Sequence, residues 1–369
     1  MSARPPITFF RRTFPLLLLL FLAPIALAQG LESGKRDIDI ATINLYVGAD
    51  FSPVLSLNPD DPDYGSKLLA GVATIYSHIL QSNFDSRADA LARQIVGRGP
   101  DLVALQEVTQ IRRQSPGDAI LGGRTPATDP HLDYLTTLLA AIERHGGHYE
   151  VVSQINETDV EVPMLTPGGF VDLRLTDRDV ILARTDLPPG HLRTSNPKGG
   201  NFEAGIPLPI GIKVLRGWCS IDVETRGRTF RLINTHLEDA LPFPIIQYLQ
   251  AGELLQGPAE TTLPVILTGD FNSDAYGNYG PDTYSLLTNE GAFVDLWTVA
   301  GGNSLGLTWG HDAFLSNVTV PFSLRLDLIL TRGSNLAATE GVVVDPFINP
   351  TPPLWFSDHA GVFGTIAIH

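Results

Sequence analysis

The segment that most constrains the fold of this chain is a short apolar run that ends in polar residues. Residues 263–267 read Leu-Pro-Val-Ile-Leu, and residues 268–272 continue as Thr-Gly-Asp-Phe-Asn. A run of this length and composition predicts a buried strand. Asp270 and Asn272 are spaced so that both point to one side at the carboxyl end of the strand, where open α/β sheets bind ligands. The alternative interpretation is a strand followed by an Asx-rich turn.

Several other apolar runs carry polar residues at their ends, and this repetition favours a functional site over a turn. The runs cover residues 40–45, 102–107, 232–238 and 325–330, and the chain closes with Ser-Asp-His-Ala at 357–360. The polar residues at these positions are Asn44, Glu107, Asn234, His236, Asp327, Asp358 and His359. Together with Asp270 and Asn272, they form the candidate site.

Three of these motifs, in this order, resemble those of the endonuclease/exonuclease/phosphatase superfamily: Gln-Glu at 106–107, Gly-Asp-x-Asn at 269–272 and Ser-Asp-His at 357–359. That superfamily includes deoxyribonucleases, abasic-site endonucleases, inositol-phosphate phosphatases and bacterial sphingomyelinases. The resemblance spans residues 37–368. It implies an α/β (α+β) fold, a four-layer sandwich of two packed mixed β-sheets flanked by helices. Hairpins mixed with helices predict only a mixed α/β fold by themselves.

The resemblance also implies a reaction and a role for each candidate residue. The reaction is metal-dependent hydrolysis of a phosphoester by in-line attack of water, without a covalent enzyme intermediate. The implied metal ligands are Glu107, Asn44 and Asp358, with Asn44 acting through the metal or through hydrogen bonds beside it. The implied catalytic residues are Asp270, Asn272, His236, His359 and Asp327, the last as the partner of His359. Carboxylates and carboxamides without a thiolate favour a hard cation, Mg²⁺ or Mn²⁺.

Two further residues are candidates for binding the substrate. Arg178 resembles a phosphate-contacting residue of the deoxyribonuclease branch, and the alternative for it is a salt bridge to a neighbouring aspartate. Asn234 lies near the end of its strand, where it would either contact the substrate or bond to the backbone.

The first 28 residues predict a secretory signal peptide, which leaves residues 29–369 as a single domain. Two arginines at 11–12 precede the apolar run 14–22, and Ala-Leu-Ala at 26–28 resembles a cleavage site. A membrane anchor is the alternative, but Pro15 and Pro24 interrupt a run that is short for a span. We therefore expect a secreted or periplasmic monomer whose mature chain has no transmembrane span.

Charge and composition leave the substrate open. Without residues 1–28 the formal net charge is −18, because that segment holds three arginines and no acid. Such a surface repels polyanions and argues against non-specific binding of duplex DNA, although a bound cation screens a site locally. We expect an endonuclease-like phosphodiesterase. A sphingomyelinase-like phospholipid phosphodiesterase is the alternative, supported by the Arg-Gly pair at 216–217 and the apolar, Trp-bearing segment 345–356. A catalytically inactive binding module is disfavoured, since every acidic and histidine position is present.

The pattern of apolar residues predicts the order of the elements along the chain. A helix starts at Asp85, with Ser86 as its N-cap. Residues 111–130 are predicted as a loop, residues 170–184 as two strands, and residues 186–212 as having no regular element. The predicted strands are 37–45, 102–107, 149–155, 218–225, 228–236, 263–270, 325–331 and 361–368, and further helices are predicted at 131–145, 247–255 and 282–290.

Overall fold

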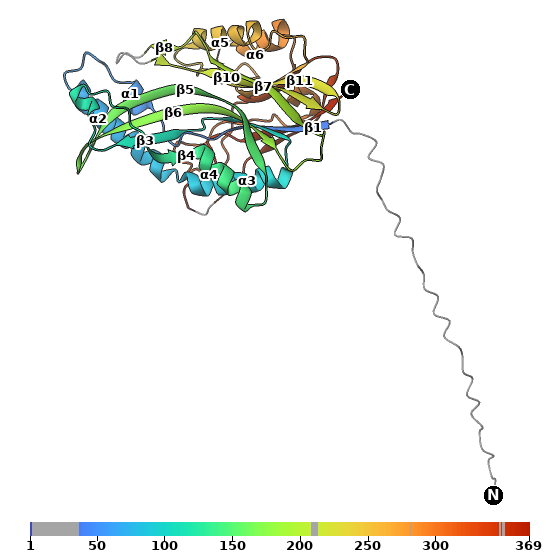
Figure 1. The fold of residues 1–369 in the computed structure, drawn as a ribbon, viewed down its shortest axis with the longest axis horizontal. Helices are drawn as coiled ribbons and strands as arrows, with labels where there is room; N and C mark the ends of the chain where they lie inside the picture. Colours follow the sequence, from blue (N-terminus) through green and yellow to red (C-terminus); the bar gives the residue numbers. More distant parts are fainter. Residues whose placement is uncertain (2–36, 208–212, 281, 347, 349–350) are drawn as a thin grey trace. The chain divides into compact units, whose positions relative to one another are not determined.

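A computed structural model describes Met1 and residues 37–207, 213–280, 282–346, 348 and 351–369. The described residues from 37 to 369 belong to one compact unit (Figure 1). Apart from Met1, the predicted signal peptide lies outside the described residues. Within the described part of the chain, the helices are all too short or too polar to cross a lipid bilayer.

Two large mixed sheets form the centre of this unit. The larger sheet has the strand order β15-β16-β1-β2-β6-β3-β4, with β5 paired to β6, and the smaller has the order β13-β14-β12-β11-β10-β7. The larger sheet consists of β1 Asp37–Asn44, β2 Leu102–Gln106, β3 Gln110–Gln114, β4 Asp129–Asp133, β5 Tyr149–Thr166, β6 Gly169–Arg184, β15 Leu336–Val344 and β16 Gly361–Ile368. The smaller consists of β7 Arg193–Asn201, β10 Gly217–Thr225, β11 Arg228–His236, β12 Val265–Asp270, β13 Val294–Asp295 and β14 Asp327–Arg332. Strands β8 Ile206–Pro207 and β9 Lys213–Val214 pair separately.

The sheets pack face to face, and helices cover their outer faces. Alternate residues of each strand enter the central core, for example Ile38 and Ile40 from β1 and Ile266 from β12. Helices α3 (Phe84–Arg98) and α4 (Tyr134–Arg144) pack on the larger sheet, and α5 (Pro244–Gln256) packs on the smaller one. The remaining helices are α1 Ser52–Leu55, α2 Tyr64–Gln81, η1 Ala119–Leu121, α6 Thr283–Ser285, η2 Leu286–Glu290 and α7 Leu296–Ala300. This arrangement confirms the four-layer sandwich (Figure 1).

Several predicted boundaries were wrong. Residues 169–184 form one continuous strand, and the loop predicted at 111–130 begins and ends in strands β3 and β4. Strand β7 lies where no element was predicted, and it tolerates Pro197 because it is the edge strand of its sheet. Helix α3 is capped by the Asn83 side chain, which accepts a hydrogen bond from the Ser86 backbone, so Ser86 is not the cap.

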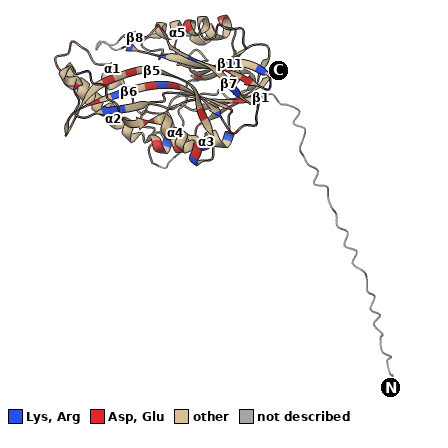
Figure 2. Cartoon of the chain, viewed as in Figure 1, with Lys and Arg blue, Asp and Glu red and all other residues tan. Residues whose placement is uncertain are grey.

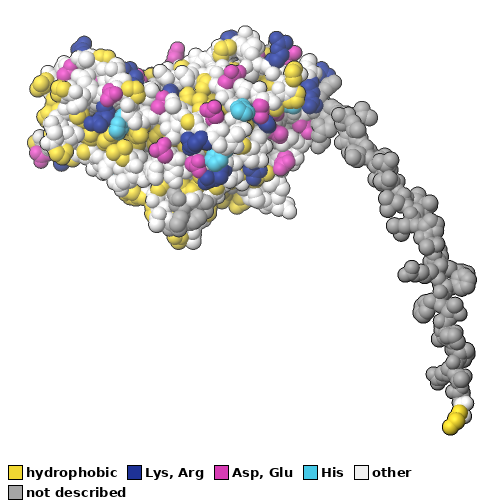
Figure 3. Space-filling view, turned by 60° about the horizontal axis from the view of Figure 1, so that its bottom comes forward, with side chains coloured by type: hydrophobic (Ala, Val, Ile, Leu, Met, Phe, Trp, Pro, Cys, Tyr) yellow, Lys and Arg dark blue, Asp and Glu magenta, His cyan; other side chains and the backbone are white. Residues whose placement is uncertain are grey.

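Acidic and basic residues are interspersed along the described elements (Figure 2). On the face drawn in Figure 3, lysine and arginine side chains lie among acidic ones and do not form a separate basic stripe. The described surface on this face therefore lacks the extended basic footprint of a protein that grips duplex DNA non-specifically.

Candidate active site

The polar strand ends meet where the two sheets face each other. Parallel pairing of β11 with β12 places His236 opposite Asp270, and antiparallel pairing of β12 with β14 places Asp327 opposite Asp270. In the larger sheet, β1 and β2 are parallel neighbours, so Asn44 lies beside the end of β2, directly before Glu107. The topology therefore collects residues that are far apart in sequence at one edge.

Unusual backbone conformations orient several of these side chains toward the candidate site. Glu107 and Asn272 have φ values of 54° and 48°, in the left-handed region that non-glycine residues rarely occupy. Gly269 has a φ of 149°, and a Cβ there would lie 1.9 Å from the Thr235 carbonyl oxygen. The glycine of the Gly-Asp-x-Asn motif thus allows β12 to approach β11. Such conformations persist where the surrounding structure fixes them, often at functional sites.

Asn44 connects carboxylates of both sheets. Its amide nitrogen donates to Glu107 Oε1 at 3.0 Å and to Asp270 Oδ2 at 2.9 Å. Its carbonyl oxygen accepts from the Tyr46 backbone at 2.8 Å. Of the two roles expected for Asn44, these contacts match the one that acts through hydrogen bonds beside a metal.

Glu107 and Asp358 suit the metal position expected from the sequence. One oxygen of Glu107 accepts from the Val47 backbone at 2.6 Å. Burial and the negative charges of Glu107 and Asp270 raise the pKa of Asp358 to about 7, although His359 opposes the shift. The surroundings of Asp358 are therefore short of positive charge. An all-oxygen donor set with this deficit fits a hard divalent cation.

His359 and Asp327 form a buried pair. Nδ1 of His359 lies 2.8 Å from Asp327 Oδ2, and its Nε2 lies 3.6 Å from Asp270 Oδ2. Burial acts to lower the pKa of His359, but the charges of Asp327, Asp270 and Asp358 raise it well above its usual value. The ring is therefore held as an imidazolium. Donor atoms of Asp270, Asp327 and His359 lie within 4.8 Å of one another, a spacing that also suits a metal ion.

His236 lies on the other side of Asp270. Its Nε2 is 3.6 Å from Asp270 Oδ2 and 3.2 Å from the amide nitrogen of Asn272. Its Nδ1 is 3.0 Å from Arg216 Nη1. Burial, Arg216 and His359 together lower the pKa of His236 well below its usual value, so the ring is neutral.

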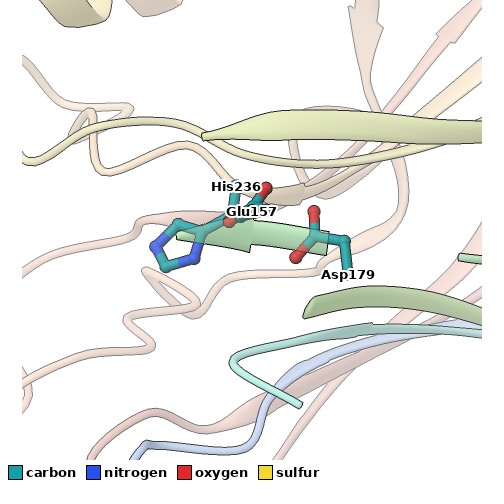
Figure 4. Close-up of side chains that lie close together, drawn as sticks. All are labelled: Glu157, Asp179 and His236. Carbon is teal, nitrogen blue, oxygen red and sulfur yellow. The ribbon is translucent and has the colours of Figure 1, made fainter. Parts of the chain in front are cut away.

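Sequence reasoning missed a buried group of charged residues behind His236. Donor atoms of Glu157, Asp179 and His236 lie within 4.8 Å of one another (Figure 4). Both carboxylate oxygens of Asp179 lack a hydrogen-bond partner among the described residues. Asp177 lies 3.3 Å from Arg216 and its pKa is raised to about 7, chiefly by burial. The sequence signals were the cluster of charges at 177–179, which had been predicted to lie between two strands, and the Arg-Gly pair at 216–217.

The structure directs the side chains of Asn234 and Arg178 into other contacts. Asn234 is fully buried and donates to the carbonyl oxygens of Leu105 and Val180, which links the two sheets. Arg178 Nη2 lies 2.6 Å from Asp133, and its Nε donates to the Val108 carbonyl oxygen. For Asn234 this is the alternative of bonding to the backbone, and for Arg178 it is the alternative of a salt bridge to an aspartate. Their role in binding substrate remains a prediction.

Comparison with known proteins identifies the class to which this fold and site belong. A model of the Endonuclease/Exonuclease/phosphatase family matches residues 42–359, and the chain belongs to this family. It is therefore a phosphoesterase of a superfamily whose enzymes are divalent-metal-dependent hydrolases. The comparison with curated proteins found no significant match.

Solved structures of low sequence identity share the fold. A family protein from Leptotrichia buccalis has 17% identity and a TM-score of 0.53, with 90% of this chain and 100% of that one covered. The catalytic domain of human nocturnin with bound sulfate has 16% identity and a TM-score of 0.52, with 91% and 96% covered. A mannosyl-6-phosphatase from Bacteroides thetaiotaomicron has 16% identity and a TM-score of 0.52, with 90% and 100% covered.

Proposed function

We propose that this protein is an exported, Mg²⁺- or Mn²⁺-dependent phosphodiesterase of the endonuclease type, acting as a monomer. The observation that carries the proposal is the convergence of both histidines on one oxygen of Asp270. Nε2 of His236 and Nε2 of His359 each lie 3.6 Å from Asp270 Oδ2. One carboxylate between two imidazoles, beside an acidic metal position, suits water attack on a phosphoester.

Each residue has a distinct task in this proposal. Glu107 and Asp358 would hold the cation, which neutralises phosphate charge when bound. Asp270 orients the attacking water and accepts its proton, and burial raises the pKa of this carboxylate toward the range useful for a base. Its other oxygen accepts from the Asn272 backbone at 2.9 Å, which fixes the carboxylate plane.

The charged His359 completes the reaction. Water oxygen bonds to phosphorus as Asp270 takes its proton, and the opposite phosphorus–oxygen bond breaks. The leaving oxygen takes a proton from solvent, to which Asp270 later returns the one it accepted, giving an alcohol and a phosphomonoester. The imidazolium of His359, held by Asp327, stabilises the charge that develops on the phosphate oxygens. Asn272 and His236 donate hydrogen bonds to the same group.

A sphingomyelinase-like activity is the second candidate, but the described part of the segment expected to touch lipid does not support it; residues 347 and 349–350 lie outside the described residues. Leu354, Trp355 and Phe356 are all buried, and the Trp355 indole stacks on His311. The apolar residues that are exposed lie elsewhere: Phe314, Val318 and Val320 have exposures of 53%, 81% and 50%. They belong to the segment between Trp309, which bridges to His359, and Leu324.

One assay separates these activities. Purified protein with Mg²⁺ or Mn²⁺ is offered plasmid DNA, RNA, sphingomyelin vesicles, bis-p-nitrophenyl phosphate and the monoester p-nitrophenyl phosphate. The Asp270→Ala variant, purified in parallel, excludes contaminating nuclease. Cleavage of nucleic acid by the wild type alone supports the proposal. Release of phosphocholine with DNA intact moves the function to lipid, and hydrolysis of the monoester alone contradicts a phosphodiesterase.

A further inference from the structure

The contact between Arg216 and His236 restricts where the imidazole carries its proton. Nη1 of Arg216 lies 3.0 Å from Nδ1 of His236. A guanidinium group has only hydrogen-bond donors and stays charged in proteins. Nδ1 must therefore accept this bond through its lone pair. A neutral imidazole with an unprotonated Nδ1 carries its hydrogen on Nε2, the nitrogen that faces Asp270.

A competing contact on the other side of the ring is weaker. The amide nitrogen of Asn272 lies 3.2 Å from Nε2, and this contact alone would favour an unprotonated Nε2. The Asn272 amide has two hydrogens, and one of them is donated to the Leu237 carbonyl oxygen at 3.0 Å. Hydrogen bonds with a charged partner are roughly twice as strong as neutral ones, so the bond from Arg216 decides the tautomer.

Arg216 is itself held firmly by carboxylates. It lies 3.3 Å from Asp177, 3.7 Å from Glu238 and 3.9 Å from Glu157. Burial acts to lower the pKa of Arg216, but these three acids raise it, so the guanidinium keeps its charge. The donor atoms of Glu157, Asp179 and His236 have a spacing that could hold a cation (Figure 4). The guanidinium group of Arg216 lies next to them and supplies a positive charge.

We propose that Arg216 is a positioning residue that holds His236 as the neutral Nε2–H tautomer, which donates to the phosphate without exchanging a proton. The role at the phosphate rests on the proposed function. The two histidines then have different protonation states and different roles, because their Nδ1 partners have opposite charges. Asp327 holds His359 as a cation, whereas Arg216 keeps His236 neutral. The other charged groups that face His236 are Asp270, Glu157, Asp179 and His359, and the carboxylates among them oppose the effect of Arg216.

The tautomer is directly measurable in the wild-type protein. Nitrogen-15 NMR of histidine-labelled protein reports the protonation of each ring nitrogen, and the His236→Asn variant identifies the signals. We expect an unprotonated Nδ1 and a protonated Nε2, unchanged between about pH 6 and about pH 8. A proton on Nδ1, or titration within this range, overturns the proposal.

Two variants and a control test the part played by Arg216. Arg216→Met removes the donor, and we expect mixed tautomers of His236 and a fall in kcat of about tenfold or more. Arg216→Lys keeps a charged donor and should restore the Nε2–H signal and most of the rate. Arg231→Met is the control, because it removes a 2.8 Å ion pair with Asp222 on the neighbouring strand and should leave the His236 signals unchanged.

The outcomes separate this inference from the proposed function. Unchanged His236 signals and rate in folded Arg216→Met would refute the role of Arg216. If Arg216→Met does not fold, the wild-type spectrum still decides the tautomer. If none of the phosphoesters is hydrolysed, the proposed function fails, while the NMR result stands independently.

Discussion

The Asn44 amide nitrogen lies 2.9 Å from Asp270 Oδ2, and this hydrogen bond joins the two sheets at the candidate active site. The same nitrogen donates to Glu107 at 3.0 Å. A carboxamide at the end of β1 thus fixes the separation between the expected metal ligand and the expected base. Correct placement of reacting groups contributes a large part of catalysis, so this link has a testable consequence.

Loss of the Asn44 carboxamide should reduce turnover by more than the accompanying loss of stability would explain. We expect Asn44→Ala to lower kcat/KM by about a hundredfold, because the buried carboxylate of Asp270 and the half-buried carboxylate of Glu107 lose their donor. Asn234→Ala is the matched control, since Asn234 is an equally buried carboxamide that bonds to the backbone of the larger sheet. It should lower the unfolding temperature but leave kcat of the folded protein nearly unchanged. A rise in KM for Asn234→Ala would support the substrate binding predicted for that residue.

The pair formed by His359 and Asp327 gives a second prediction. His359→Ala should lower kcat by at least about a hundredfold while folding survives. Asp327→Asn keeps the shape but removes the charge that holds the imidazolium, so the pKa of His359 should fall. Rate measurements across pH would then show activity lost at a lower pH in Asp327→Asn than in the wild type. Identical pH profiles would contradict the role of Asp327.

The sequence predicted which strand ends meet at the candidate site, because strand ends have a simple geometry. Asp270 and His236 follow apolar runs, and parallel neighbours bring their carboxyl ends to one edge. The group around Arg216 could not be predicted in this way. Its members lie on β5, β6 and beside β10, and their proximity depends on how the two sheets face each other.

The continuous strand β6 was missed for a related physical reason. Its charged residues at 177–179 look like a turn in sequence, because burying unpaired carboxylates is costly. Asp177 is accepted in a strand because Arg216 contacts it from another part of the chain. The local sequence around residues 177–179 does not reveal that partner. A long apolar segment such as residues 263–270, by contrast, indicates a strand by itself.

The raised pKa of Asp358 predicts a pH-dependent stability. Its usual pKa is 3.8 and its folded value is about 7, so the folded protein binds this proton more tightly than the unfolded chain does. Its contribution to stability is therefore full below about pH 4 and is lost as pH rises through about 7. In EDTA, the wild type should lose stability relative to Asp358→Asn as the pH rises over this range. The unfolding temperature of the variant minus that of the wild type should therefore increase with pH. Mg²⁺ should reverse the difference near pH 7.5, and a difference independent of pH and metal would refute a metal position at Asp358.

Gly269 should tolerate no side chain. Gly269→Ala places a Cβ 1.9 Å from the Thr235 carbonyl oxygen and should reduce the free energy of unfolding by at least about 2 kcal/mol. Gly227→Ala is the control, because Gly227 also has a positive φ but open space around it. It should cost only roughly 1 kcal/mol of backbone strain. Equal losses in urea unfolding would show that the close approach of β11 and β12 is not what requires glycine.

The most direct test of metal-dependent hydrolysis at this site is the rate of phosphodiester cleavage by wild type and Asp270→Ala, each with EDTA and then with added Mg²⁺ or Mn²⁺. We predict that EDTA abolishes wild-type turnover, that the metal restores it, and that Asp270→Ala remains at least about a hundredfold slower with metal present. Turnover that resists the chelator, or a near-normal rate in folded Asp270→Ala, would contradict the assignment.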